Sequence, residues 1–310
     1  MSKKVIVVTL HGMGDFEESD SKNNLEEIEK ELFSDQNDPL FKKIEWKHVN
    51  YSIHFNSAKK YWKQLEQGGI DEKPDPHIIE ATKTKWLLRL LQKLSSKFKK
   101  TVTKNSRYFF LTYFGDPITY LHRTKKYPDN YHKVHKTIYD SLKAVYKKYN
   151  KDDYKFVILA HSLGGYVLSN YMYDAQQYEK ATKSEDRKKF PDWEIYSKEL
   201  KKDKGLSDFV RLKNLDTLIT YGCNISLFVA GMPKVQAIKA PSKNFAWYNY
   251  YDTDDILGWP LRPLGGGYEK VVNEDIFLNV GAPVISHTLY PTKKNFQKKF
   301  KNKLEELLKD

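Results

Sequence analysis

Apolar runs alternate with amphipathic stretches along most of the chain. The strongest strand patterns cover residues 4–10, 44–51, 156–160, 215–221, 245–251 and 271–280. Helical patterns lie between most of them. Strands that alternate with helices predict a mainly parallel sheet with helices on both faces, which is a three-layer α/β fold. Residues 5–8 and 156–159 are continuous apolar runs, as expected of central strands that are buried on both sides.

Two segments are longer than ordinary connections between a strand and a helix. They span residues 56–130 and 174–212. Connections of this length are usually functional or have structure of their own. We therefore expect both to be helical cap insertions at one end of the sheet, within a single domain that spans residues 1–310.

The first insertion contains a basic amphipathic stretch. Leu87, Leu91, Leu94 and Phe98 recur at helical spacing, and residues 81–115 hold nine Lys or Arg but no Asp or Glu. This pattern predicts a cap helix whose apolar stripe packs on the core. A contact with an anionic membrane surface is the alternative. At the other end of the chain, Phe296, Phe300, Leu304 and Leu307 predict a closing amphipathic helix.

Composition narrows the class of protein. The formal net charge of +13 favours acidic partners without specifying one, and no motif of a nucleic-acid-binding fold accompanies it. Cys223 is the single cysteine, so an intrachain disulfide is excluded. The apolar run 5–10 is too short for a signal-peptide core, and no stretch reaches the roughly 20 apolar residues of a membrane span. These features predict a soluble cytoplasmic protein.

The clearest chemical signal lies where the apolar run 156–160 ends. It continues as Ala160-His161-Ser162-Leu163-Gly164-Gly165 and then becomes helical. A Ser in a sharp strand-to-helix turn, with small residues two positions before and after it, is typical of a nucleophile elbow. Ala160 and Gly164 are these small residues, although Ala replaces the more usual first Gly. The pattern predicts Ser162 as a nucleophile.

A serine nucleophile needs a base and an acid that orients the base. Where such an elbow occurs, the chain order is Ser, acid, His. Of the nine histidines only His287 follows Ser162, so the order selects it as the base. The acid is expected after residues 245–251, where Asp252, Asp254 and Asp255 compete. The apolar pair that follows favours Asp255, with Asp254 as the main alternative.

The oxyanion of a tetrahedral intermediate needs amide donors. We expect one from Leu163, directly after the nucleophile, and the other from the glycine-bearing turn His11-Gly12-Met13-Gly14 after residues 5–10, with Met13 as its donor. His11 is interpreted as a residue that shapes this turn. His132 and His135 have a metal-like spacing, but the zinc-binding motif His-Glu-x-x-His is absent, so neither a metal nor another cofactor is predicted.

These motifs resemble those of lipase/esterase-like serine hydrolases of the α/β-hydrolase superfamily. Three further segments share the resemblance: Asp-Asp-Ile-Leu-Gly-Trp-Pro-Leu, Ser-His-Thr-Leu-Tyr and Gly115-Asp116-Pro-Ile-Thr-Tyr. The resemblance is greatest to bacterial members with a His-Ser-Leu-Gly elbow. It implies an α/β-hydrolase fold, a Ser-Asp-His triad and hydrolytic chemistry, without a substrate. The activity that we expect is hydrolysis of acyl esters of small molecules or lipids. The alternatives are an acyltransferase or thioesterase that uses the same triad, and a catalytically silent binding module of the same fold.

Overall fold

The computed structural model describes residues 4–12, 28–33, 35, 37–55, 57–68, 111, 114–115, 117–121, 130–281 and 286–309. Its centre is a six-stranded sheet with the order β2-β1-β3-β4-β5-β6, in which every neighbouring pair is parallel. The strands are β1 (Lys4–Leu10), β2 (Ile44–Val49), β3 (Tyr154–His161), β4 (Thr217–Tyr221), β5 (Ala246–Tyr251) and β6 (Glu274–Phe277). The predicted α/β class and parallel sheet are confirmed.

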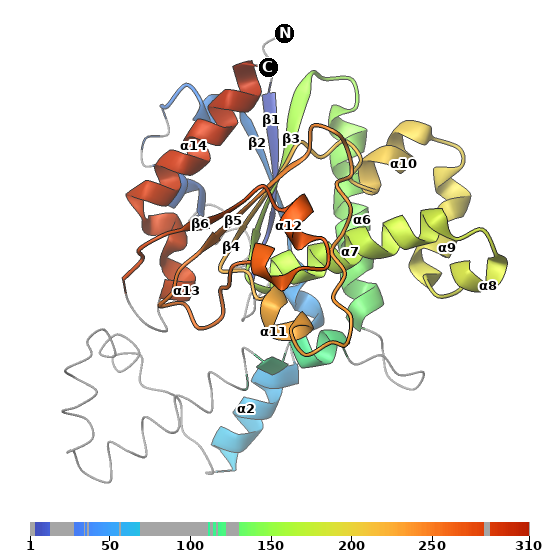
Figure 1. Ribbon diagram of the computed structural model, residues 1–310, viewed down its shortest axis with the longest axis horizontal. Coiled ribbons are helices and arrows are strands. Elements are labelled where there is room, and N and C mark those ends of the chain that lie inside the picture. The colour runs from blue at the N-terminus through green and yellow to red at the C-terminus, as the bar shows by residue number, and fades with distance from the viewer. Residues whose placement is uncertain are drawn as a thin grey trace.

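Helices cover both faces of this sheet (Figure 1). The longer ones are α2 (Ser57–Gln67), α6 (Asn130–Tyr149), α7 (Leu163–Lys180), α9 (Pro191–Leu200), α10 (Lys204–Val210) and α14 (Lys294–Lys309). The shorter helices are α8 (Ser184–Arg187), α11 (Ile225–Val229), α12 (Tyr268–Val271) and α13 (Ser286–Leu289). Single 3₁₀ turns are η1 (Phe41–Lys43), η2 (Ser52–His54), η3 (Arg262–Leu264) and η4 (Tyr290–Thr292). Within the described part of the chain, no helix is both long enough and apolar enough to cross a bilayer.

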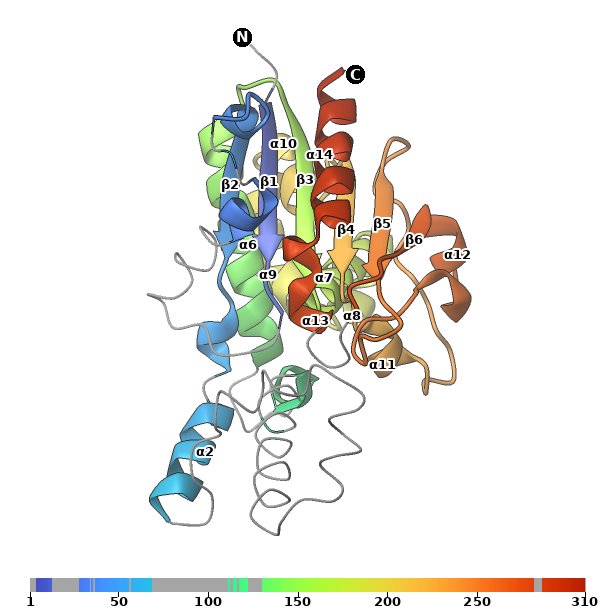
Figure 2. The ribbon, with the colours of Figure 1, turned by 90° about the vertical axis from the view of Figure 1, so that its left-hand side faces the viewer.

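Alternation along the strands divides the apolar side chains between two cores. Ile6 and Val8 of β1 join the core under α6 and α7, whereas Val5 and Val7 join the core under α14. Figure 2 shows α14 in front of the sheet, with α6 behind it. The predicted closing helix is confirmed, because Phe296, Phe300 and Leu304 are all buried in the second core.

The predicted strand boundaries differ most at the last strand. Only Glu274–Phe277 pair with β5, and Val271 ends the short helix α12. The backbone before the strand is helical, because the N–H groups of Val271 and Val272 donate to Gly267 O (3.1 Å) and Tyr268 O (3.0 Å). Asn273 then donates its backbone N–H to Trp247 O (2.9 Å) and accepts from Trp247 N at its side-chain Oδ1 (2.8 Å). Asn273 therefore ties the loop to the start of β5 before the strand begins.

The two predicted insertions are described to different extents. Residues 174–212 form the end of α7 followed by α8, α9 and α10, and α9 and α10 pack against α6. Most of residues 56–130, including the stripe at Leu87, Leu91, Leu94 and Phe98, lie outside the described residues.

A buried polar network joins β4, β5 and β6 near the carboxyl edge. Asn249, which has no exposed surface, accepts a hydrogen bond from Thr220 Oγ1 (2.8 Å). Its amide donates to Trp259 O (3.0 Å) and to Asp275 Oδ1 (2.7 Å). The same aspartate accepts from the backbone N–H groups of Leu261 and Arg262. Asn249 therefore fastens the loop after β5 to its neighbouring strands.

Asn249→Ala should lower the free energy of unfolding by about 2–3 kcal/mol, because it removes the hydrogen-bond partner of several buried polar groups at once. Urea unfolding measures the loss. The matched control is Asn214→Ala at an exposed turn position, which should change stability by less than about 0.5 kcal/mol. Equal effects of the two changes would contradict the anchoring role of Asn249.

Candidate active site

Ser162 occupies a strained turn between β3 and α7. Its backbone has φ 50° and ψ −120°, a conformation that non-glycine residues rarely adopt. Two backbone hydrogen bonds hold the turn: Ser162 N–H donates to Tyr221 O (3.0 Å), and Gly165 N–H donates to Ser162 O (3.1 Å). The strand, the sharp turn and the helix are the elements that the sequence predicts here.

The small residues around Ser162 are required by close approaches of the backbone. A Cβ atom on Gly164 would lie 2.6 Å from His11 O and 2.7 Å from Leu10 O, and these backbone atoms have little freedom to shift. A Cβ atom on Gly12 would lie 2.9 Å from Ser162 Cβ. The turn after β1 is thus pressed against the turn after β3.

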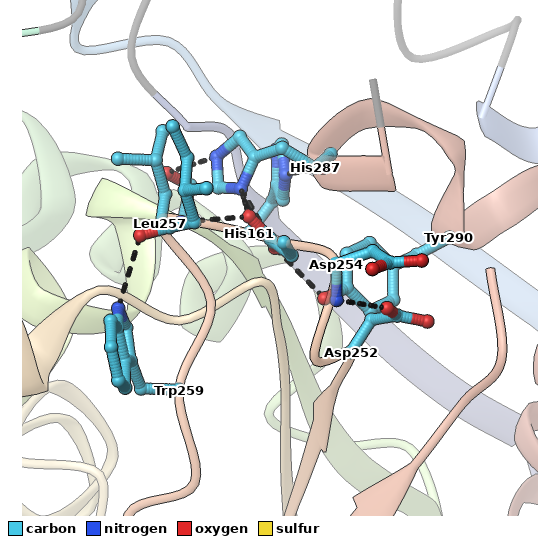
Figure 3. A network of polar contacts seen from close by, with 10 residues as sticks. His161, Asp252, Asp254, Leu257, Trp259, His287 and Tyr290 are labelled. Atoms are coloured by element: carbon cyan, nitrogen blue, oxygen red, sulfur yellow. Dashed lines mark hydrogen bonds and ion pairs between the residues drawn. The ribbon is translucent and has the colours of Figure 1, made fainter. Parts of the chain in front are cut away.

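Three side chains from distant parts of the chain meet at this turn. His287 Nε2 lies 2.8 Å from Ser162 Oγ, and His287 Nδ1 lies 3.0 Å from both carboxylate oxygens of Asp255. Ser162 is 0%, Asp255 3% and His287 3% exposed. The structure therefore brings together the predicted nucleophile, base and acid in one buried hydrogen-bonded chain. Figure 3 shows His287 beside the loop that follows β5.

The three competing aspartates have different surroundings. Asp252 accepts hydrogen bonds from the backbone N–H groups of Asp254 and Val280. Asp254 is partly exposed, and Asp255 is the one that reaches His287. Of the apolar pair that favoured Asp255, Leu257 is buried but Ile256 is 49% exposed, so only Leu257 anchors the loop.

Three donors keep the Asp255 carboxylate ionised. Burial alone would raise its pKa, but hydrogen bonds from His287, Leu257 N–H and Tyr290 OH hold the pKa below the ordinary value. Leu257 N lies 2.9 Å from Oδ1, and Tyr290 OH lies 2.8 Å from Oδ2. The ionised acid can therefore orient His287 and stabilise positive charge on it.

Sequence reasoning missed Tyr290 as part of this site. Tyr290 follows His287 by three residues, and a spacing of three places two side chains on the same side of a helical turn. That spacing was the available signal. Figure 3 shows Tyr290 next to the aspartates of the β5 loop.

His161 was also missed: its Nε2 lies 2.8 Å from the backbone O of His287.

The predicted oxyanion donors can be placed only in part. Leu163 is buried and is the first residue of α7, so its N–H has no acceptor within the helix. Met13, the second predicted donor, lies outside the described residues. Gly12, directly before it, lies against Ser162.

His11 shapes the turn after β1 through a defined set of hydrogen bonds. Its Nδ1–H donates to Gly12 O (2.7 Å), and its Nε2 accepts from Tyr51 N–H (3.3 Å). The ring stacks on Tyr51 at a centroid distance of 4.1 Å. Burial, with a contribution from nearby His48, lowers the pKa of His11 to about 3. His11 is therefore neutral at physiological pH.

The two histidines with metal-like spacing have other partners. His132 Nδ1 pairs with Asp192 (2.6 Å), and His135 Nε2 contacts Tyr120 OH (2.9 Å). Among the residues that the structure describes, no cluster of three or more His, Cys, Asp or Glu side chains is arranged to hold a metal ion.

The burial of His11 predicts a loss of stability in acid. Its folded pKa of about 3 lies below the ordinary value of about 6.5, so at pH 5 the unfolded chain binds a proton that the native state does not. This side chain should therefore lower the free energy of unfolding by about 2 kcal/mol between pH 7 and pH 5. Urea unfolding of wild type and His11→Gln at both pH values tests this, because Gln does not titrate. An equal pH dependence in both proteins would contradict the prediction.

The site lies where the strand order of the sheet reverses. The chain leaves β1 and β3, which are neighbours in the sheet, in opposite directions, and a crevice at their carboxyl ends is the usual binding position in open parallel sheets. Comparisons with protein-family models, with curated proteins and with solved structures return no match. Because many functions share such sheets, the geometry of the site itself has to carry the functional conclusion.

Proposed function

We propose that the protein is a serine hydrolase that cleaves carboxylic esters through an acyl-enzyme on Ser162, on a lipase/esterase-like α/β-hydrolase fold. The observation that carries the proposal is the buried chain from Ser162 Oγ through His287 to Asp255, with distances of 2.8 Å and 3.0 Å. A serine hydroxyl becomes a good nucleophile when a neighbouring base removes its proton. The strained backbone at Ser162 is the second feature that supports the proposal.

In the acylation step, Ser162 Oγ attacks the carbonyl carbon of the ester while its proton passes to His287 Nε2. Asp255 stabilises the imidazolium that forms. We expect the N–H groups of Leu163 and Met13 to stabilise the negative charge on the former carbonyl oxygen. The intermediate then collapses, and the leaving alcohol takes the proton from His287.

In the deacylation step, His287 takes a proton from water, and the resulting hydroxide attacks the acyl carbon on Ser162. The ester bond to Oγ breaks, and Oγ recovers its proton from His287. The products are a carboxylic acid and the free enzyme. An acyltransferase or a thioesterase would use the same residues with another acceptor or a thioester substrate.

The proposed substrate is an acyl ester of a small molecule or a lipid. Several exposed apolar side chains lie on the segments that follow the carboxyl ends of β4 and β5, which is the edge that carries the site. They are Leu227 (40%), Met232 (47%), Ile256 (49%) and Trp259 (44%). Apolar side chains at this edge favour an acyl substrate. Binding of an anionic membrane by the basic stretch 81–115 stays a prediction.

Labelling by a fluorophosphonate tests the nucleophile directly. Ser162 Oγ should displace fluoride from phosphorus, and mass spectrometry should find the adduct on Ser162. Ser162→Ala should abolish labelling, and His287→Ala should slow it by at least about 1,000-fold, because the serine then lacks its base. The control is Ser207→Ala, a change to a buried serine in α10, which should label at the wild-type rate. Failure of the folded wild-type protein to label would favour a catalytically silent binding module.

Tyr290→Phe should slow the same reaction by about 10-fold. The change removes one of the hydrogen-bond donors to Asp255. The negative charge of the carboxylate is then less well stabilised, and Asp255 orients His287 less well. The labelling rate measures the effect, with Tyr173→Phe on α7 as the matched control, since Tyr173 OH makes only a long 3.5 Å contact with Gln236. Equal rates for Tyr290→Phe and wild type would show that the donor is dispensable.

A further inference from the structure

His161 precedes the nucleophile and has no part in the proton transfers described above. It is the last residue of β3 and pairs in the sheet with Tyr221 of β4. Its side chain lies between the turn after β1, the turn at Ser162 and the helix that carries His287. Figure 3 shows the rings of His161 and His287 close together.

One hydrogen bond joins His161 to the backbone of the proposed base. His161 Nε2 lies 2.8 Å from His287 O. A carbonyl oxygen only accepts, so Nε2 carries the proton, and Nδ1 of the neutral ring carries none. Nδ1 faces the turn after β1, since a Cβ atom on Gly12 would lie 2.9 Å from it.

The ring of His161 is held in place on both sides. It stacks on Tyr221 with a centroid distance of 4.6 Å and an interplanar angle of 14°. The His287 ring lies 4.8 Å away at 37°. Burial and the proximity of His287 lower the pKa of His161 to about 3, so the side chain stays neutral at physiological pH. A neutral ring does not oppose the positive charge that His287 gains in the proposed reaction.

The backbone carbonyl of His287 contacts a side chain from another element of the fold. Helix α13 is only four residues long, and the α-helical partner of the His287 carbonyl would be the N–H of residue 291. Residue 291 is a proline and has no N–H. His161 supplies a donor to this carbonyl from the end of β3.

We propose that His161 is a positioning residue, whose Nε2–H holds the His287 backbone so that His287 Nε2 stays within hydrogen-bonding distance of Ser162 Oγ. The inference rests on the proposed function. Asp255 fixes the His287 ring from one side, and His161 fixes its main chain from the other. Because His161 is adjacent to Ser162 in sequence, the base is tied to the nucleophile's own backbone.

The test compares two substitutions of His161 in fluorophosphonate labelling. His161→Phe keeps a ring that can stack on Tyr221 but removes the donor, whereas His161→Gln keeps an N–H donor near the position of Nε2. The measured constants are kinact, the maximal rate constant of labelling, and KI, the probe concentration that gives half of this rate. We expect kinact to fall by about 10- to 100-fold in the Phe variant, because small displacements of a catalytic group slow the reaction strongly, whereas KI should change little. The Gln variant should stay within about threefold of wild type.

His132→Phe, a like change on α6 at a residue paired with Asp192, should leave both constants unchanged. A wild-type kinact in the Phe variant, or an equal loss in Phe and Gln, overturns the positioning role while leaving the proposed function intact. If the Phe variant does not fold, the Gln variant decides: a kinact below about one tenth of wild type overturns the proposal. A wild-type protein that is not labelled overturns the proposed function and this role together.

Discussion

The backbone of Ser162 is the constraint on which the site depends. A non-glycine residue at φ 50° costs on the order of 1–3 kcal/mol and persists only where its surroundings hold it. Here β4 supplies an acceptor for its N–H, and the turn after β1 packs against its Cβ. The parallel sheet brings these segments together, because the carboxyl ends of β1, β3 and β4 lie at one edge. The strain at Ser162 is thus supported by the most buried part of the fold.

The protonation states at the site follow from the burial of its ionisable side chains. Taking ionisable groups out of water favours their neutral forms unless partners compensate. For His11 and His161, burial outweighs the hydrogen bonds of the ring and lowers the pKa of both to about 3. Asp255 has donors from His287, Leu257 and Tyr290, and its pKa stays below the ordinary value. The site therefore holds an ionised carboxylate that faces His287, while His11 and His161 stay neutral.

Asp255 and His287 are both held by contacts beyond their mutual hydrogen bond. The loop after β5 carries Asp255 and is fastened at Trp259 by Asn249, which also binds Asp275 of β6. The short helix α13 carries His287 and is joined to β3 by His161. Because α13 has a single turn, it has little rigidity of its own. Contacts between elements, rather than helix length, set the geometry of the site.

The sequence by itself determined the α/β class, most strand positions, the strand-to-turn-helix context of Ser162 and the choice of His287. These features are local patterns or follow from chain order, so neighbouring residues are enough to reveal them. The tertiary structure decided which of Asp252, Asp254 and Asp255 contacts His287, because the three are close in sequence and only the folded loop gives their side chains different directions and burial.

The tertiary structure also placed Tyr290 and His161 at the site. The hydrogen bonds that join His287 to Ser162, Asp255 and His161 span 125, 32 and 126 residues of chain. Contacts over such separations leave no periodic pattern in a single sequence. They exist because parallel strands bring the ends of distant segments to one edge of the sheet, where burial then decides which polar groups must find partners.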